Sequence, residues 1–361
     1  MTNFYPDYNN VDICQYAPLF GFYTLGFIKQ HRPDIVVITI RIDWDSSNMI
    51  PSQYANYDWL APAIDLALLD GKKVCLLPWD EYVVFIPNAQ LTQIVNRYAD
   101  QPVYWVTQLD SMAQFESYQQ EHDFSCRMLE LPWWLLNDCL TYYRVHDVVS
   151  ADSPTNYNFL CMVNNPASHK LEILKQLQQQ HLDQFGLLTL SSATEGFDFC
   201  QINRHYPYNN IRPGYMKMAA QTYVNDTWIS KNVENFLYLE REYNQIPLIV
   251  NSESVTVPFM STEKSIWPVL LGRLFLVFGR PGSMNWIQKF YDIDISQWAN
   301  LEFDQSGPDH IRVSSMLTTN RALITNAHDV YTQLQPKLEQ ARWSFGRNMY
   351  NFFLKQLEKI T

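Results

Sequence analysis

The sequence predicts an α/β protein built from two Rossmann-like, doubly wound domains of similar size. The 361 residues are enough for two domains of ordinary size. Short apolar runs alternate with segments whose apolar residues recur at helical spacing, which is typical of βαβ units and a mostly parallel sheet. A polar, turn-rich linker over residues 148–157 separates two such series. We therefore expect a cleft between the two domains.

The first series predicts a domain over residues 1–150. Its run IVVITI at residues 35–40 is β-branched and predicts a buried parallel strand. A helix is expected over residues 58–71, where the helical spacing stops at a glycine. Further strands are expected over residues 74–77 and 103–107.

The second series predicts a domain over residues 156–335, followed by C-terminal helices over residues 336–361. Within this domain, leucine and isoleucine line one side of an expected helix at residues 168–182. Apolar residues such as Phe353 and Leu357 give the terminal helices an apolar side, and we expect these helices to cross back over the domain junction. Strands are expected over residues 158–163, 186–190, 247–251 and 274–278.

Composition and charge narrow the class of protein. Apolar residues make up 47% of the chain, so a sizeable core can form. The formal net charge of −11 argues against broad attraction to nucleic acid but leaves room for a local basic groove. The six cysteines show no C-x-x-C pair and no histidines at zinc spacing, so we expect reduced thiols and a cytoplasmic location. We expect neither a signal peptide nor a membrane span, because no apolar run is long enough.

Three common motifs are absent from the sequence. There is no G-x-x-x-x-G-K-[ST], no G-x-G-x-x-G and no G-x-S-x-G. Their absence counts against P-loop nucleotide hydrolysis, simple dinucleotide binding and α/β-hydrolase chemistry.

The segment 258–284, PFMSTEKSIWPVLLGRLFLVFGRPGSM, carries the strongest functional pattern. Glu263 and Lys264 stand at the start of an expected helix, and a helix N-terminus favours phosphate. Lys264 would pair with a diphosphate and Glu263 would accept hydrogen bonds from a ribose, a combination that suits a nucleotide-sugar. A capped helix with Ser261 or Thr262 as N-cap is the structural alternative, but it leaves the lysine in the first turn unexplained.

This segment resembles the donor-binding segment of fucosyltransferase-like GT-B glycosyltransferases, which share a T-E-K, helix, glycine and apolar-strand pattern. It is closer still to the glycosyltransferase-like proteins of bacteriophages. The segment NYNFLCMVNNPASHKLEILKQL resembles the opening strand of the same group's second domain. The resemblance covers about residues 157–300 and implies a GT-B fold. Periodicity alone would fit periplasmic binding proteins or two-domain kinases equally well.

The resemblance implies a donor site in the second domain. Glu263 would hold the ribose and Lys264 the diphosphate, while Asn164 and Lys170 would lie at the cleft end of the first strand. The turn from Gly279 to Ser283 is either a plain turn or an anion-binding nest of N–H groups. The full expected set is Glu263, Lys264, Thr262, Asn165, His169, Arg204, Arg212, Gly279 and Ser283.

The transfer also needs a base that takes the proton from the acceptor hydroxyl, and this base is expected from the first domain. Acids that directly follow predicted strands would lie at the carboxyl edge of the sheet, where ligands bind. One of these acids would be the base and the others solvated loop acids. The candidates are Asp80, Glu81, Asp45 with its neighbour Asp43, and Asp110.

We expect no metal and no cofactor beyond the nucleotide-sugar substrate. The triplets D-W-D at residues 43–45 and D-I-D at residues 292–294 resemble metal-binding D-x-D motifs, but such triplets arise often by chance. Cationic side chains and helix dipoles would instead stabilise the leaving diphosphate.

The function expected from the sequence is transfer of a sugar from a nucleotide-sugar, such as a UDP-sugar, to an acceptor hydroxyl. One acceptor is a hydroxymethylated pyrimidine in bacteriophage DNA, which would make the protein a DNA-modification enzyme in the host cytoplasm. The many Trp and Tyr residues favour this acceptor, and the acidic charge disfavours it. The alternatives are a glycan or lipopolysaccharide acceptor, and a non-catalytic nucleotide-sugar-binding module.

Overall fold

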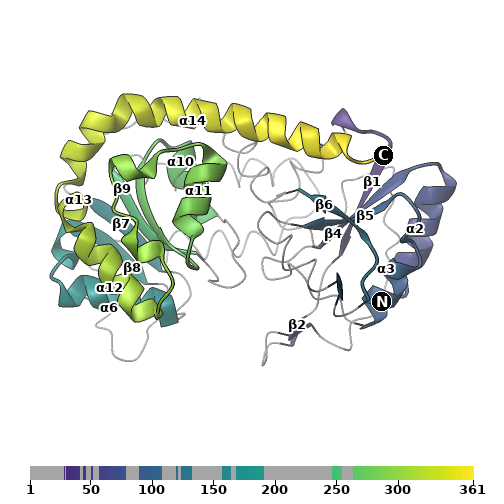
Figure 1. The fold of residues 1–361 in the computed structure, drawn as a ribbon, viewed down its shortest axis with the longest axis horizontal. Coiled ribbons are helices and arrows are strands. Elements are labelled where there is room, and N and C mark those ends of the chain that lie inside the picture. The colour runs from purple at the N-terminus through teal and green to yellow at the C-terminus, as the bar shows by residue number, and fades with distance from the viewer. Residues whose placement is uncertain are drawn as a thin grey trace, which may run out of the picture. The chain divides into compact units, whose positions relative to one another are not determined.

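The chain divides into two compact α/β units. Unit 1 consists of Met1–Leu140 together with Met349–Thr361, and unit 2 consists of Thr141–Asn348. Among the described residues, each unit contains one parallel four-stranded sheet (Figure 1). The computed structural model describes residues 28, 30–40, 44–45, 50–51, 57–78, 89–107, 119–120, 123–131, 157–163, 168–190, 246–253 and 263–361.

The sheet of unit 1 follows the order of the chain. Its strands pair in the order β1-β4-β5-β6, and every pairing is parallel. The two helices α2 and α3 pack on this sheet and bury Leu60, Ile64 and Leu91 against strand residues such as Trp105. The elements are β1 (Ile35–Ile40), α2 (Leu60–Leu69), β4 (Lys73–Pro78), α3 (Ala89–Asn96), β5 (Val103–Thr107), β6 (Arg127–Glu130) and the short antiparallel pair β2 (Trp44–Asp45) and β3 (Ile50–Pro51).

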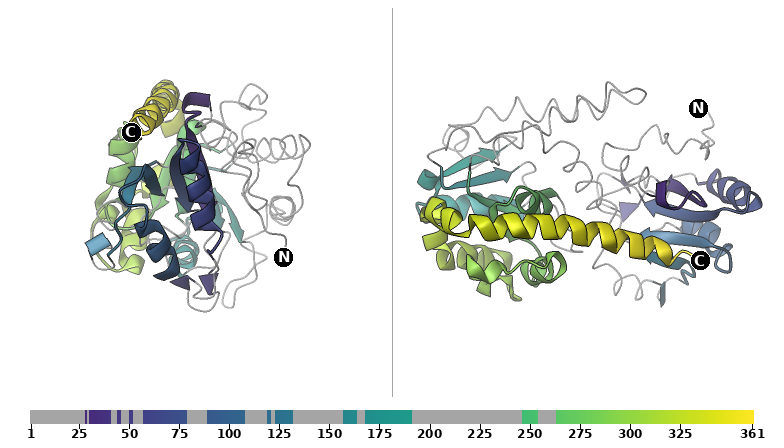
Figure 2. Two further views of the ribbon diagram at one scale, coloured as in Figure 1. Left: turned by 90° about the vertical axis from the view of Figure 1, so that its right-hand side faces the viewer. Right: turned by 90° about the horizontal axis from the view of Figure 1, so that it is seen from above.

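The end of the chain belongs to unit 1. Helix α14 (Ala327–Glu358) is one continuous helix that begins in unit 2 (Figure 2), and its residues from Met349 onward group with unit 1. The C-terminal helices were expected to begin at residue 336, but α14 begins at Ala327. Pro336 does not mark a helix boundary, because it is an exposed residue inside α14. Met349, Phe353, Leu357 and Ile360 are all buried. The last residues of the chain thus contribute apolar side chains to the unit formed by its first half.

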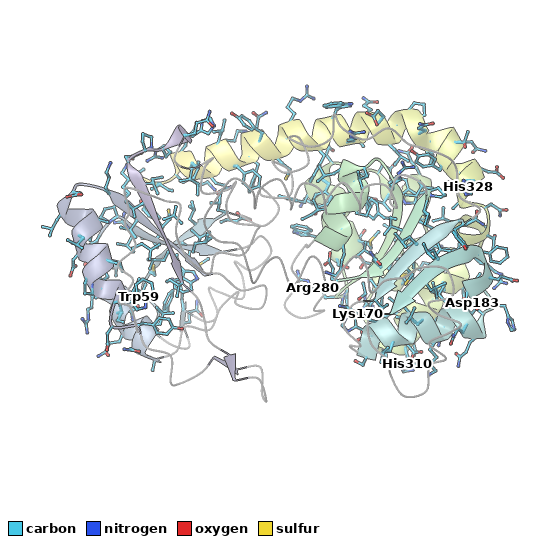
Figure 3. The ribbon with its side chains drawn as sticks, turned by 180° about the vertical axis from the view of Figure 1, so that it is seen from behind. Trp59, Lys170, Asp183, Arg280, His310 and His328 are labelled. Carbon is cyan, nitrogen blue, oxygen red and sulfur yellow. The ribbon has the colours of Figure 1, made fainter. Side chains whose placement is uncertain are left out.

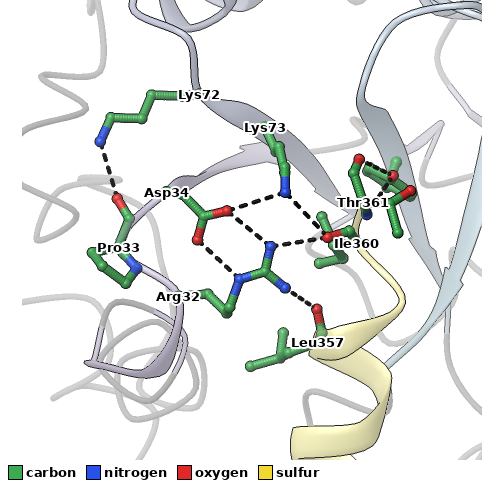
Figure 4. A network of polar contacts seen from close by, with 9 residues as sticks. Arg32, Pro33, Asp34, Lys72, Lys73, Leu357, Ile360 and Thr361 are labelled. Atoms are coloured by element: carbon green, nitrogen blue, oxygen red, sulfur yellow. Dashed lines mark hydrogen bonds and ion pairs between the residues drawn. The ribbon is translucent and has the colours of Figure 1, made fainter.

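Polar contacts reinforce the docking of this segment (Figure 4). Arg32 donates hydrogen bonds to the carbonyl oxygens of Leu357 and Ile360, the second at 2.9 Å. Tyr104 in β5 exchanges two hydrogen bonds with the backbone of Thr361, at 2.9 and 3.0 Å. We call residues 357–361 with Arg32 and Tyr104 the C-terminal latch.

The sheet of unit 2 reverses its order. Its strands pair as β10-β9-β7-β8, all parallel, so the chain moves from β7 to one side and then returns to the other side with β9. The strands are β7 (Phe159–Val163), β8 (Gly186–Leu190), β9 (Leu248–Ser252) and β10 (Leu274–Phe278). Every residue of β9 and of β10, which ends this order, is buried, as is typical of a parallel sheet covered on both faces.

Helices cover both faces of this sheet. The chain runs one way across the sheet from β7 to β8 and the opposite way from β9 to β10. Because such connections are right-handed, the helices in them, α6 and α10, lie on opposite faces of the sheet (Figure 1). Unit 2 therefore has the doubly wound order that the sequence predicts, whereas the four described strands of unit 1 show no reversal. The helices are α6 (Ser168–Gln179), α10 (Glu263–Leu270), α11 (Ser283–Tyr291), α12 (Asp309–Thr319) and α13 (Arg321–Thr325), with 3-10 turns η2 (Asp183–Phe185), η4 (Ile295–Gln297) and η5 (Glu302–Asp304).

Within the described ranges, no helix is long and apolar enough to cross a membrane.

Candidate functional site

Buried polar side chains gather at the carboxyl edge of the unit 2 sheet. Burying a polar group costs free energy unless it is hydrogen-bonded or serves a function, so such a concentration calls for a reason. In an open parallel sheet, ligands bind outside the carboxyl ends of the strands where the strand order reverses. The buried polar residues at this edge are His169, Lys170, Asn251, Ser252, Glu253, Lys264, Ser265, Ser283, Asp304 and Arg312.

His169 connects the two sides of the reversal. It lies in the first turn of α6, which follows β7, and its Nε2 is 3.2 Å from the carbonyl oxygen of Glu253, which follows β9. A carbonyl oxygen only accepts, so Nε2 carries the proton in this hydrogen bond. The imidazole ring also stacks near Phe278 of β10, with ring centroids 6.5 Å apart.

The surroundings of His169 keep its ring neutral. Burial lowers the pKa of His169 most, and the neighbouring Lys170 lowers it further. The bond to the Glu253 carbonyl and the carboxylate of Asp309 act in the opposite direction, but the net shift of the pKa is downward. At neutral pH the ring is therefore an uncharged donor at Nε2 and an acceptor at Nδ1.

Two lysines lie in the first turns of the helices that follow β7 and β9. Lys170 is 5% exposed and Lys264 is 9% exposed. A helix N-terminus is the positive end of the helix dipole, so a lysine there gains nothing from the dipole. Glu253, fully buried directly after β9, adds an acidic side chain at the same edge. The edge therefore combines buried cations, two helix N-termini and one buried acid.

The turn after β10 is built by contacts within the protein. The N–H of Ser283 donates to the carbonyl oxygen of Arg280 at 3.1 Å, and Gly282 takes φ +85°, as position three of a type II turn requires. Asp304 accepts hydrogen bonds from the Ser283 hydroxyl at 3.3 Å and from the backbone N–H of Asn285 at 3.0 Å. The protein's own carboxylate thus occupies the N-terminus of α11.

Arg312 fixes the end of β10 from helix α12. Its Nη2 donates to the carbonyl oxygen of Gly279 at 2.9 Å, and its guanidinium lies 4.6 Å from the centre of the Phe278 ring. These contacts give Gly279 and Ser283 structural roles, and their expected contact with a ligand stays a prediction. Arg280, which follows Gly279 and is labelled in Figure 3, is half-buried. Burial lowers its pKa.

The structure brings some of the predicted site residues together at this edge and leaves others undescribed. His169, Lys170, Lys264, Gly279 and Ser283 all lie there. Glu263 opens helix α10 and Asp45 lies in β2 opposite Ile50, but the side chains of both are outside the described part. The predicted residues that lie wholly outside the described ranges are Asp43, Asp80, Glu81, Asp110, Asn164, Asn165, Arg204, Arg212 and Thr262.

The two D-x-D triplets differ in what the structure says of them. In D-I-D, Asp292 ends helix α11 with φ +55°, and the Asp294 carboxylate accepts a hydrogen bond from Gln297 at 3.1 Å. Only part of D-W-D is described, as strand β2. Among the described residues, no group of three or more His, Cys, Asp or Glu side chains could hold a metal ion.

Sequence reasoning missed Glu253, Asp304 and Arg312. A usable signal existed for Glu253, because it directly follows an apolar strand just as Asp80 and Glu81 do. No such signal existed for Asp304 and Arg312, which reach the edge from elements that lie beyond α11 in the chain.

The fold and this edge define an α/β protein whose second unit has a Rossmann-like sheet and a candidate anion-binding site at its point of reversal. Comparisons of the chain with protein-family models, curated proteins and solved structures give no match in any of the three.

Proposed function

We propose that the protein is a glycosyltransferase of the GT-B type and that unit 2 binds the nucleoside diphosphate of a nucleotide-sugar. The observation that carries this proposal is the placement of buried Lys170 and Lys264 in the first turns of α6 and α10, which flank the strand-order reversal. Phosphate groups bind well where helix N-termini and cationic side chains converge. The resemblance of the T-E-K segment to donor-binding segments supports the same assignment.

The same cations would assist the chemistry. In the transfer, the acceptor oxygen forms a bond to the anomeric carbon while the bond from that carbon to the diphosphate oxygen breaks. Negative charge then grows on the leaving diphosphate, and Lys170, Lys264 and the helix N-termini would stabilise it. The hydroxyl proton would pass to an acid of unit 1, for which Asp80, Glu81, Asp45 and Asp110 remain the candidates.

The donor site is tested by replacing the two lysines with methionine, which keeps the apolar stem and removes the charge. Calorimetry with UDP and GDP should show that Lys170→Met and Lys264→Met each weaken nucleotide binding by about 10- to 100-fold, since a hydrogen bond to a charged group contributes about 1.5–3 kcal/mol. Lys175→Met is the matched control, because Lys175 lies on the same helix α6 with a side chain that is 54% exposed.

Thermal unfolding of the same variants separates a lost contact from a damaged fold. Removing a buried charge is often tolerated when the new side chain packs well, so we expect folded variants. Nucleotide affinity that is unchanged in both buried-lysine variants, or lowered equally in the Lys175 control, would contradict the proposed donor site.

Turnover decides between an enzyme and a binding module. The protein is incubated with UDP- and GDP-sugars, and release of free UDP or GDP is followed with two acceptors, hydroxymethylated-pyrimidine DNA and a glycan. We expect nucleotide release that requires one of the two acceptors. The acceptor that is required shows whether the sugar is transferred to DNA or to a glycan. Nucleotide binding without release under any combination would assign the protein as a non-catalytic nucleotide-sugar-binding module.

A further inference from the structure

His169 presents two ring nitrogens with different tasks. Nε2 is committed to the Glu253 carbonyl oxygen at 3.2 Å and carries the proton. Within the described part of the chain, no residue bonds Nδ1, and Nδ1 is not one of its fully buried unpaired atoms. The residue keeps 8% of its surface exposed, and Nδ1 is the ring nitrogen left to bond a ligand at the edge.

The charged groups around the ring leave Nδ1 as an acceptor. Lys170 on α6 disfavours a second proton, and burial acts in the same direction. Asp309 on α12 favours that proton, but the guanidinium of Arg312 lies 3.4 Å from its carboxylate and offsets it. Phe278 contributes only an aromatic ring. The ring therefore stays neutral near pH 7, with a lone pair on Nδ1.

We propose that Nδ1 of His169 accepts a hydrogen bond from a carbohydrate hydroxyl of the bound nucleotide-sugar, either on the ribose or on the transferred sugar. This inference rests on the proposed function. Phosphate oxygens without a proton cannot donate to Nδ1, whereas every carbohydrate hydroxyl can. Lys170 and His169 would then divide the ligand between them, the lysine holding the diphosphate and the histidine a neighbouring hydroxyl.

An acceptor of this kind gives specificity rather than bulk affinity. A ligand that lacks the hydroxyl leaves Nδ1 unpaired in the complex, and sites built to hydrogen-bond a hydroxyl reject analogues without it. His169 is thus predicted to discriminate hydroxylated ligands from deoxy ligands, and Lys170 is not.

Two substitutions separate the ligand contact from the bond to Glu253. In His169→Gln, the amide nitrogen takes the place of Nε2 and keeps the donation to Glu253, while the acceptor at Nδ1 is lost. In His169→Asn, the amide oxygen takes the place of Nδ1 and the donation to Glu253 is lost. The matched control is His328→Gln, because the Nε2 of His328 makes the same kind of bond, 3.1 Å from the carbonyl oxygen of Tyr157, where unit 2 enters β7. Figure 3 labels His328 and Lys170 at well-separated places on unit 2.

The readout is a ratio of affinities. For the ribose arm, it compares UDP or GDP with the 2′,3′-dideoxy analogue. For the sugar arm, it compares UDP-glucose or GDP-mannose with the corresponding nucleotide-deoxysugars. We expect a ratio of about 3 to 10 in one arm for the unaltered protein, the contribution of one neutral hydrogen bond. The ratio should fall to about 1 in His169→Gln and should persist in His169→Asn and His328→Gln.

The ratio should also depend on pH. Burial holds the pKa of His169 below its usual value, so the ratio is constant at neutral pH and changes only on acidification, once Nδ1 gains a proton and no longer accepts. The titration of the phosphates cancels, because both ligands of the ribose arm carry them.

A ratio that is unchanged by His169→Gln in both arms overturns the inference and leaves the proposed function standing. Equal damage from His169→Gln and His169→Asn also overturns it, because the role of the residue would then be structural. If neither UDP nor GDP binds the unaltered protein, the proposed function itself fails and the inference fails with it.

Discussion

Asp304 holds the first turn of helix α11 from outside that helix. Its Oδ2 accepts hydrogen bonds from the backbone N–H and the side-chain amide of Asn285, both at 3.0 Å, and its Oδ1 accepts one from Ser283. Asp304→Ala should therefore lower the free energy of unfolding of unit 2 by about 1–2 kcal/mol, the usual cost of losing such a cap. Asp304→Asn keeps an accepting oxygen and should cost less. Urea denaturation of the three proteins measures both differences.

The pH dependence of this difference has a definite sign. Burial raises the pKa of Asp304 above its usual value, although the hydrogen bonds from Asn285 and Ser283 oppose the shift. A raised pKa means that the folded state binds the proton more tightly, so Asp304 contributes most at low pH and loses that contribution as the pH rises. Relative to Asp304→Asn, the unaltered protein should gain stability as the pH is lowered from neutral toward about pH 4. A loss of relative stability on acidification would contradict this reading.

At the scale of single residues, the sequence locates chemistry where a local rule applies. Lys264 was singled out because it stands at a helix start, and His169 because it follows an apolar strand; both lie at the carboxyl edge. The partners that neutralise or brace such residues follow no local rule. The bond from His169 to Glu253 joins positions 84 residues apart, and no periodicity predicts it.

At the scale of elements, Arg32 is the centre of the C-terminal latch. Its guanidinium is held by Asp34 at 2.8 Å and donates to the carbonyl oxygens of Leu357 and Ile360. Arg32→Met should therefore loosen residues 357–361, since each hydrogen bond from a charged group contributes about 1.5–3 kcal/mol and partial exposure reduces that. Amide hydrogen exchange should accelerate there by about tenfold or more while β7 and β9 are unchanged.

Two further measurements test the role of Arg32 in the C-terminal latch: a control substitution at another arginine and the pH dependence of amide exchange. Arg97→Met removes an exposed arginine of the same unit and should leave exchange at the C-terminus unaltered. Hydrogen bonds from Arg32 hold the pKa of Asp34 far below its usual value, so the latch is complete at neutral pH and weakens as the pH falls below about 4. Exchange that is equally slow in Arg32→Met and the unaltered protein would show that apolar packing alone docks the segment.

Apolar runs predicted the strands well because a parallel strand that is buried on both faces is a nearly continuous apolar run in the sequence. The expected bounds of β1, β5, β8 and β10 coincide with the observed ones. Strand β6 was missed because its sequence, RMLE, is short and carries two charges. Helix α10 was expected despite Pro268, and Gly272 follows it with φ +60°, a backbone conformation that suits glycine.

At the scale of the whole molecule, the order of the strands is the part that periodicity cannot supply. Nothing in the apolar runs of unit 2 distinguishes the order β10-β9-β7-β8 from the chain order found in unit 1. The strand order depends on the direction in which each crossover connection runs along the sheet. The order in turn sets the position of the reversal, and the candidate site lies at that position. The class of fold was therefore predictable from the sequence, whereas the convergence of Lys170, His169 and Glu253 was not.

Unit 1 is formed by two separate stretches of the chain, so removing the C-terminal stretch should destabilise unit 1 but not unit 2. Deleting residues 349–361 removes buried Met349, Phe353, Leu357 and Ile360 from unit 1 and nothing from unit 2. Each such side chain contributes about 1.5–3 kcal/mol by burial, and a domain is stable by only about 5–15 kcal/mol. Unit 1 should therefore unfold or exchange its amides freely at β1, β4 and β5, while β7, β9 and β10 stay protected.

Single substitutions test the same argument without shortening the chain. Leu357→Ala should lower the stability of unit 1 by about 2–5 kcal/mol, whereas Lys355→Ala changes an exposed residue of the same helix and should have little effect. If Leu357→Ala only frayed helix α14, amide exchange would also accelerate along residues 327–348, because α14 begins in unit 2. Loss of protection confined to unit 1 supports its dependence on the returning segment, and equal loss in both units would show that the two units fold as one.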